Sequence, residues 1–145
     1  MTNIGIIGAG MIANIHAEAA NRIGSNIVAV HDSRNNRAEE FGEKHKCEVE
    51  DSVESLVSRD DIDGVVIAVP NDRHSELAIA ALNAGKHVLL EKPMAMSLQQ
   101  CDEILSARDA SGNVLQMGFV CRYSPAALKA KELIDSGVIG EVLHV

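Results

Sequence analysis

The feature that most constrains the fold of this chain is its opening segment, where an apolar run leads directly into closely spaced glycines. Residues 4–7 are typical of a buried strand, and Gly8 and Gly10 follow at once. Gly8 permits a tight turn, Gly10 lets the backbone approach a phosphate without a Cβ between them, and Ala13 allows a helix to pack closely on the strand. The N-terminus of that helix offers free N–H groups to an anion. The segment therefore predicts a strand, turn and helix that bind the pyrophosphate of a dinucleotide.

A second apolar strand is predicted over residues 27–31, and Asp32 follows it. In the dinucleotide-binding pattern, an acidic residue about twenty positions after the glycines accepts hydrogen bonds from the adenosine ribose. The alternative is that Asp32 only starts the turn before a helix over residues 34–46. The order of strand, glycines, helix, strand and acid favours the cofactor. A carboxylate repels a 2′-phosphate and so favours NAD, whereas the nearby Arg34 and Arg37 leave NADP open.

Composition restricts the class of protein. The chain has 145 residues, enough for one domain with a proper core. Its net charge of -8 argues against nucleic acid or an anionic membrane as a partner, since both require a basic surface. The 3 cysteines, Cys47, Cys101 and Cys121, have no paired spacing, which argues against disulfides or a metal site and favours a reducing, cytoplasmic compartment. No segment has the length and apolar character of a membrane span.

Strands and helices are predicted to alternate along the rest of the chain. Further strands are expected over residues 47–49, 64–69, 86–90 and 113–117, and further helices over 52–58, 71–84, 98–112 and 125–136. The expected N-caps are Asn71, Ser97 with Gln100 at capping-box spacing, and Ser124 before Pro125. Six strands separated by helices predict a doubly wound parallel sheet in three α/β/α layers, the NAD(P)-binding Rossmann fold, over residues 1–120.

The last segment, residues 121–145, does not fit that unit. It is predicted to contain a linking helix and then, over residues 141–145, the beginning of another strand. The chain ends inside this strand without a turn, cap or polar tail. We expect a second domain to begin here and to be truncated.

Unusual polar residues follow the carboxyl ends of the predicted strands. They are Gly8 to Gly10, Asp32, Pro70 and Asn71 with His74, Glu91 to Pro93, and Arg122 with Tyr123. Ligands of open α/β sheets bind at this edge. The loops at the opposite edge, residues 24–25 and 60–61, carry no comparable cluster. The sequence therefore predicts a binding site along one edge of the sheet.

Lys92 is the candidate catalytic residue. Pro93 restricts the backbone of Lys92 to an extended conformation. Oxidising an alcohol by hydride transfer also requires removal of the hydroxyl proton, which a lysine amine can accept. The alternative is a solvated lysine at the end of a strand, because lysine is mostly a surface residue.

Several of these segments together resemble the glucose-fructose oxidoreductase, inositol dehydrogenase and MocA family. They are Gly8 to Ala13 with His16, Val69 to Asn71 with His74, Glu91 to Pro93, and Gly118 to Pro125. The resemblance covers the whole chain. It implies an NAD(P)-dependent dehydrogenase or reductase with a small polyhydroxy substrate, such as a sugar or cyclitol. It also implies a Rossmann domain followed by a larger α/β domain that carries substrate residues and the contacts of a homo-oligomer, so this chain alone should turn over little or nothing.

The resemblance also implies roles for individual residues. Catalysis falls to Lys92, and cofactor binding to Gly8, Ala9, Gly10, Met11, Ile12, Asp32, Arg37, Ala68, Pro70, Asn71, His74, Glu91, Lys92 and Arg122. Glu91 would steady the nicotinamide side, and the Lys92–Pro93 bond is often cis in such proteins. After Gly-Phe the family often reads Asn-Arg-Arg, so that of residues 120–122 only Arg122 matches. His16 is interpreted as a histidine that packs its helix.

Two other classes of protein remain in competition. A freestanding NAD-sensing regulatory module has a similar length and the same glycine pattern, but needs no lysine before a proline after its fifth strand. A methyltransferase shares the acid after the second strand, but its expected antiparallel last strand is missing here. No metal is expected.

Overall fold

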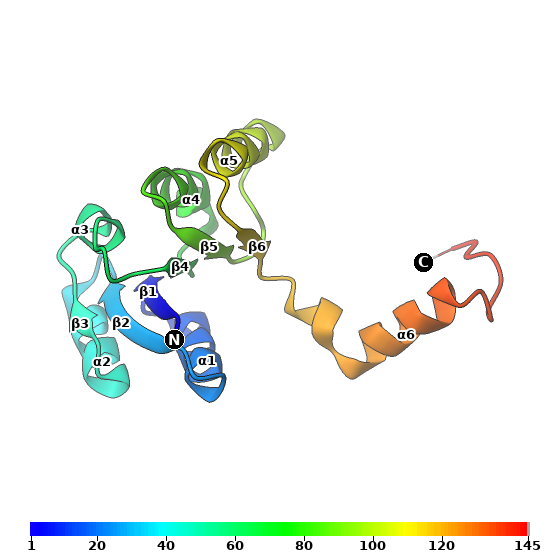
Figure 1. Ribbon diagram of the computed structural model, residues 1–145, viewed down its shortest axis with the longest axis horizontal. Helices are drawn as coiled ribbons and strands as arrows, with labels where there is room; N and C mark the ends of the chain where they lie inside the picture. The colour runs from blue at the N-terminus through cyan, green and yellow to red at the C-terminus, as the bar shows by residue number, and fades with distance from the viewer. Residues whose placement is uncertain (145) are drawn as a thin grey trace.

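The computed structural model describes residues 1–144, most of which form a six-stranded parallel sheet covered by helices (Figure 1). The strand order is β3-β2-β1-β4-β5-β6, and every neighbouring pair is parallel. The elements are β1 (Asn3–Ile7), α1 (Met11–Arg22), β2 (Asn26–His31), α2 (Asn35–His45), β3 (Glu48–Val49), α3 (Val53–Val57), β4 (Gly64–Ile67), α4 (His74–Asn83), β5 (His87–Leu90), α5 (Leu98–Ser111), β6 (Leu115–Met117) and α6 (Pro125–Asp135). Single 3-10 turns occupy Asn71–Arg73 and Val120–Tyr123. The predicted doubly wound Rossmann fold is confirmed.

The sheet is covered on both faces, and β1 shows why. Successive side chains of a strand point to opposite faces. Ile6 accordingly packs in one core with α1 and α2, and Ile7 packs in the other with α3, α4 and α5. Figure 1 shows α1 and α2 on one side of the sheet and α3, α4 and α5 on the other. A strand buried on both faces needs the unbroken apolar run from which β1 was predicted.

Small residues let α1 lie close to the sheet. Ala13, Ala17 and Ala20 are buried and recur at the spacing of one helix face. Because alanine side chains are short, the axis of α1 approaches the strands closely. The prediction that Ala13 packs the helix on the strand is confirmed.

At the carboxyl end of β4, two observed boundaries differ from the predicted ones. The strand ends at Ile67 rather than residue 69, because its neighbours β1 and β5 end opposite it at Ile7 and Leu90. Asn71 is not the N-cap of α4: it begins a 3-10 turn, and the cap position falls to Arg73, which makes no side-chain cap hydrogen bond.

The predicted serine caps are confirmed. Ser97 and Ser124 each accept a hydrogen bond from the backbone N–H three residues later. Only half of the predicted capping box forms at α5, because the Gln100 side chain accepts from the N–H of Met96 instead of Ser97. The caps agree with the sequence because they depend on residues a few positions apart.

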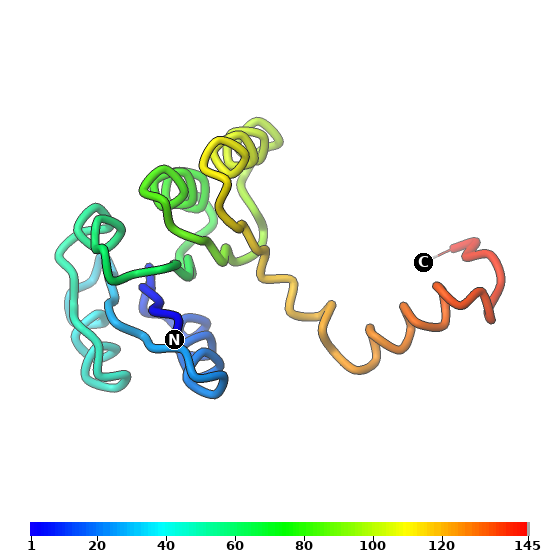
Figure 2. The backbone as a smooth tube through the Cα atoms, viewed as in Figure 1, coloured from blue at the N-terminus to red at the C-terminus, as the bar shows by residue number. Residues whose placement is uncertain are grey.

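Residues 119–144, here called the arm, extend away from the sheet (Figure 1; the tube in Figure 2 shows the same course). No residue of the arm is buried. The predicted strand is not formed over residues 141–144, because no other strand lies beside them to complete a ladder; Val145 lies outside the described residues. Among residues 1–144, no helix has both the length and the apolar character needed to cross a membrane.

Candidate functional site

Backbone hydrogen bonds align the residues that follow the strands along the carboxyl edge of the sheet. The N–H of the first residue after β1, β4, β5 and β6 donates to the last carbonyl of the neighbouring strand. These bonds are Gly8 to His31 at 2.8 Å, Ala68 to Ile7 at 2.9 Å, Glu91 to Ile67 at 3.1 Å and Gly118 to Leu90 at 2.8 Å. As a result, the glycine turn, the loop after β4, the Glu91 segment and Gly118 succeed one another across one edge.

Only glycine fits at position 8. Its φ is +95°, and an added Cβ would lie 2.4 Å from the carbonyl oxygen of Ala68. Gly10 differs, since a Cβ there would meet nothing within 4 Å. Gly8 therefore makes the turn, while Gly10 leaves open space at the start of α1.

The N-terminus of α1 is free to bind an anion. Gly10 is the N-cap and has no side chain to satisfy the first N–H groups, and the first turn contains no acidic residue. Met11 and Ile12, in that first turn, are exposed. The unsatisfied N–H groups and the helix dipole together suit a phosphate.

Asp32 ties the glycine turn to the end of β2. Its Oδ2 accepts a hydrogen bond of 2.8 Å from the N–H of Ala9, and its Oδ1 accepts one of 2.9 Å from the N–H of Arg34. The Arg34 Nε also lies 3.7 Å from Oδ1, and the carboxylate is only 9% exposed. A carboxylate offers about four lone-pair positions, so acceptor capacity remains for ribose hydroxyls.

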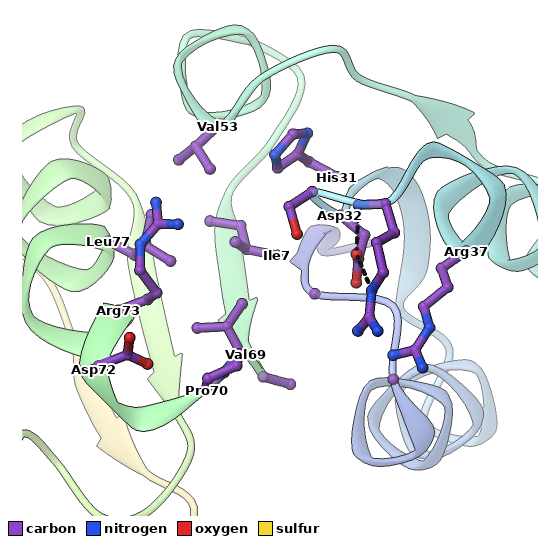
Figure 3. Close-up of a pocket in the computed structure, with 15 residues that line it drawn as sticks. Ile7, His31, Asp32, Arg37, Val53, Val69, Pro70, Asp72, Arg73 and Leu77 are labelled. Atoms are coloured by element: carbon purple, nitrogen blue, oxygen red, sulfur yellow. Dashed lines mark hydrogen bonds and ion pairs between the residues drawn. The ribbon is translucent and has the colours of Figure 1, made fainter.

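A cavity of about 580 Å³ opens beside Asp32, within the size range of ligand pockets. It is lined by Ile7, Gly8, Gly10, His31, Asp32, Ser33, Arg34, Arg37, Val53, Ala68, Val69, Pro70, Asp72, Arg73 and Leu77. In Figure 3, Asp32 and Arg37 lie on one side, Asp72 and Arg73 lie on the other, and Ile7 and Val69 lie between them. Sequence reasoning missed Asp72 and Arg73, although their position just after Pro70, at the end of a strand, was a signal for them.

Lys92 lies farther along the same edge, in the exposed segment after β5. Its backbone N–H donates to Glu91 Oε2 at 3.2 Å. The Lys92–Pro93 peptide bond is cis, as the family resemblance implied. Lys92 and Glu91 do not line the cavity, so the cavity and the candidate catalytic residue occupy neighbouring stretches of the edge.

His74, the first residue of α4, contacts both the loop after β4 and the segment after β5. It is 0% exposed; its Nδ1 lies 2.7 Å from the carbonyl oxygen of Pro93, and its Nε2 lies 3.1 Å from that of Val69. The side chain implied to border the cofactor is thus behind the two loops, where it holds them together. Leu77 and Ala78, three and four positions later, are buried too, and this spacing was the signal that His74 faces the core.

His16 has a specific partner as well as a place in the packing of α1. Its Nε2 lies 2.8 Å from Glu91 Oε1, and the two side chains are 14% and 13% exposed. A signal existed in the sequence, because His16 follows the buried Ala13 by three positions, and a polar side chain on a buried face requires a partner.

Other residues singled out in the sequence lie apart from the cavity. Asn71 is exposed in the 3-10 turn before α4. Arg122 is on the arm, with its guanidinium carbon 5.3 Å from the centre of the Phe119 ring. Within residues 1–144, no three His, Cys, Asp or Glu side chains lie together in a way that would hold a metal ion.

Comparisons with known proteins agree with this architecture. The family model described as "Oxidoreductase family, NAD-binding Rossmann fold" matches residues 2–119. Inositol 2-dehydrogenase of Salmonella typhimurium is 37% identical over 146 residues, covering 97% of this chain and 44% of that protein. 2,7-anhydro-N-acetylneuraminate hydratase of Mediterraneibacter gnavus is 39% identical over 121 residues, covering 83% of this chain and 32% of that protein.

The fold also matches solved structures. The crystal structure of scyllo-inositol dehydrogenase from Lactobacillus casei with bound NAD(H) and scyllo-inositol has a TM-score of 0.90 and 30% identity, covering 97% of this chain and 43% of that one. The chain therefore spans less than half the length of these relatives.

Proposed function

This chain belongs to the oxidoreductase family with an NAD-binding Rossmann fold, as its motifs predicted, and from that premise we propose that it is the cofactor-binding half of an NAD-dependent dehydrogenase. The substrate class that we propose is a sugar, a cyclitol or a related polyhydroxy compound. The observation that carries this proposal is the alignment of the glycine turn, the Asp32 cavity and the Lys92 segment along one edge of the sheet.

The residues at this edge fit a dinucleotide. The uncapped start of α1 and the open space at Gly10 suit the pyrophosphate, and Asp32 offers acceptors to the adenosine ribose. Pro70 and Ala68, on the β4 side of the cavity, would border the rest of the cofactor. When bound, NAD supplies the hydride acceptor.

In this proposal Lys92 moves the proton that accompanies hydride transfer. Its amine would accept the proton of the substrate hydroxyl during oxidation and return it during reduction. His74 acts indirectly, by joining the Pro93 carbonyl to the wall of the cavity at Val69. Lys92 is exposed, as a group that meets a substrate must be.

We also propose a preference for NAD over NADP. Asp32 is held at the cavity by Ala9 and Arg34, so a 2′-phosphate there would face a fixed carboxylate. Arg34, Arg37 and Arg73 also line the cavity and lower the cost of that phosphate. We therefore expect NADP to bind more weakly than NAD rather than not at all.

Calorimetric titration tests the cofactor site. The folded chain should bind NAD with a Kd in roughly the micromolar to millimolar range. Replacing Asp32 with Ser should weaken NAD and narrow its advantage over NADP. A folded wild-type chain that binds neither nucleotide would contradict the proposal.

Two substitutions of Lys92 test catalysis in the whole protein, assayed on a panel of cyclitols and sugars. Lys92→Ala should abolish turnover while leaving the Kd for NAD nearly unchanged. Lys92→Arg should do the same, because arginine keeps the charge but does not release its proton. The matched control is Lys46→Arg, which changes an exposed lysine at the end of α2 and should retain activity. Turnover in Lys92→Arg would remove Lys92 from proton transfer.

A second reaction class is supported by the hydratase relative, which is about as similar to this chain as the dehydrogenase is. Adding water to a substrate leaves no reduced nicotinamide behind. The panel should therefore be analysed for products by mass spectrometry as well as for NADH. NAD binding without any product would instead favour a regulatory NAD-sensing module.

We further propose that residues 121–145 link this domain to a substrate-binding and oligomerisation domain. The described part of this segment buries none of its side chains, although Leu128 and Ile134 on α6 are apolar. Its relatives are more than twice as long as the stretch that they share with this chain. Limited proteolysis of the whole protein should cleave this segment slowly if another domain covers it.

A further inference from the structure

We propose that His16 is a positioning residue that fixes Glu91, and through it the backbone of the candidate catalytic Lys92, against the helix that binds the cofactor pyrophosphate. The effect of His16 on catalysis rests on the proposed function, whereas its contact with Glu91 does not depend on that function. It assigns to His16 and Gly118 a role in setting the geometry of the site.

The Glu91 carboxylate is fixed through both oxygens. Oε1 lies 2.8 Å from His16 Nε2, and Oε2 accepts a hydrogen bond of 3.2 Å from the N–H of Lys92. Each side chain of the His16–Glu91 pair is close to nine-tenths buried. With one oxygen in contact with His16 on α1 and the other bonded to the backbone N–H of Lys92, the Glu91 side chain acts as a bracket between α1 and the segment after β5.

Gly118 makes room for this bracket. A Cβ added at residue 118 would lie 2.8 Å from Glu91 Oε1 and 3.0 Å from its carboxyl carbon. Gly118 is buried, and its N–H is bonded to the carbonyl oxygen of Leu90, the residue before Glu91. The ends of β5 and β6 and the middle of α1 therefore meet at one carboxylate.

The Glu91 contacts join two parts of the candidate site whose relative position matters, α1 and the Lys92 segment. The start of α1 would hold the pyrophosphate, and Lys92 would meet the substrate next to the nicotinamide. On the other side of the segment, His74 Nδ1 lies against the Pro93 carbonyl oxygen. Lys92 is thus an exposed residue between two histidine-held neighbours, which restricts where its backbone can move.

His16→Ala and His16→Gln test the bracket. The amide of Gln can donate to Glu91 as the imidazole does, whereas Ala cannot. His45→Ala is the matched control, because His45 Nε2 also makes a 2.8 Å contact with another element, to Asn14 Oδ1 on α1, but away from Glu91. Gly118→Ala displaces the same carboxylate without altering His16.

The first readout is hydrogen exchange at the Lys92 amide, measured by NMR in each folded variant. The exchange rate should rise severalfold in His16→Ala and Gly118→Ala and return toward the wild-type rate in His16→Gln. Equal rates in His16→Ala and His45→Ala would overturn the proposal, whatever reaction the protein catalyses.

The second readout is the kinetics of the whole protein. In His16→Ala and Gly118→Ala, kcat should fall about tenfold to a hundredfold, the usual cost of a misplaced reacting group, with little change in the Kd for NAD. His16→Gln should recover most of kcat. A kcat unchanged in His16→Ala, or not recovered in His16→Gln, would overturn the positioning role. If the wild-type protein turns over no substrate, the proposed function fails, and the exchange rates alone decide whether His16 holds Lys92.

Discussion

The sheet with its helices, residues 2–118, and the arm, residues 119–144, are specified in different ways. The sheet region buries two apolar cores, whereas no residue of the arm is buried. Yet α6 is as well formed as the helices of the sheet region, with Ser124 as its N-cap and Pro125 in its first turn. Local signals thus define α6, whereas the candidate site forms only where long-range packing brings strand ends together.

The boundary between the two regions lies at the site itself. Within residues 1–144, Gly118 is the last buried residue, and it is buried against Glu91. Immediately after it, Phe119 is exposed. The chain therefore leaves the sheet at the point where the candidate catalytic segment is held.

The largest expected contrast is in stability. Ile67→Ala removes a fully buried side chain from β4 and should lower the free energy of unfolding by about 2–5 kcal/mol. In the same 145-residue chain, Leu128→Ala, at a side chain that is 54% exposed on α6, should change it by less than about 0.5 kcal/mol. Urea unfolding of both variants measures the difference. A comparable loss of stability in Leu128→Ala would show that the arm packs against the sheet region, and would contradict the difference between the two regions.

Much of this contrast could be predicted from the sequence, because both regions carry strong local signals. The unbroken apolar runs of β1 and β4 and the caps Ser97 and Ser124 were identified from neighbouring residues alone. The glycine turn and Asp32 were predicted because their spacing along the chain is itself the pattern. In these cases, the residues that determine the structure lie within about twenty positions of one another.

What could not be predicted depends on partners far apart in the sequence. His16 and Glu91 are 75 positions apart, and nothing local indicates that they meet. The N-cap of α4 lies two residues later than the predicted Asn71. The spacing of His74 from Leu77 and Ala78 indicated its burial, but not that it would contact the carbonyl groups of both Val69 and Pro93. Residues 141–144 resembled a strand by composition, but a strand also needs a neighbour.

Two glycines with positive φ, one in each region, allow the cost of an added Cβ to be compared between the sheet region and the arm. Gly8→Ala should cost about 2–4 kcal/mol, combining the left-handed backbone with a Cβ placed 2.4 Å from the Ala68 carbonyl oxygen, and should abolish NAD binding. Gly137→Ala in the arm has a similar φ of +70° but open space around the Cβ, and should cost only about 1–2 kcal/mol. Urea unfolding and calorimetry with NAD measure both effects. Equal costs would mean that the turn at Gly8 relaxes around a side chain.

The rates at which cysteines are alkylated also compare the two regions. Burial raises the pKa of the Cys47 thiol to about 11. At pH 8 its reactive thiolate is then roughly a hundredfold scarcer than that of an ordinary thiol. Cys121, exposed on the arm, should therefore be alkylated by iodoacetamide much faster than Cys47. Mass spectrometry of peptides over time, in a Cys101→Ser background, measures both rates, and similar rates would show that the sheet region opens readily around Cys47.

The smallest expected effect concerns ion pairs. Arg59 lies in the sheet region, 18% exposed, and its Nη1 is 2.8 Å from Glu50 Oε1, whereas Lys131 and Asp135 on α6 form an exposed pair. Arg59→Met should cost about 1 kcal/mol through the lost pairs with Glu50, Glu48 and Asp61, and Lys131→Met less than about 0.5 kcal/mol. The hydrogen bond from Arg59 lowers the pKa of Glu50 in the folded state.

The pH dependence of the Arg59→Met effect follows from the direction of that shift. Because the pKa of Glu50 is lower when folded than when unfolded, the stabilisation is complete above the unfolded value of about 4.3 and is lost as the pH falls through the folded value. The difference in unfolding free energy between wild type and Arg59→Met should therefore shrink as the pH is lowered from about 5 into the acidic range. Urea titrations across this range measure it. A difference that stays constant with pH would mean that the stabilisation by Arg59 does not come from its ion pairs with carboxylates, because methionine keeps an apolar stem of similar length.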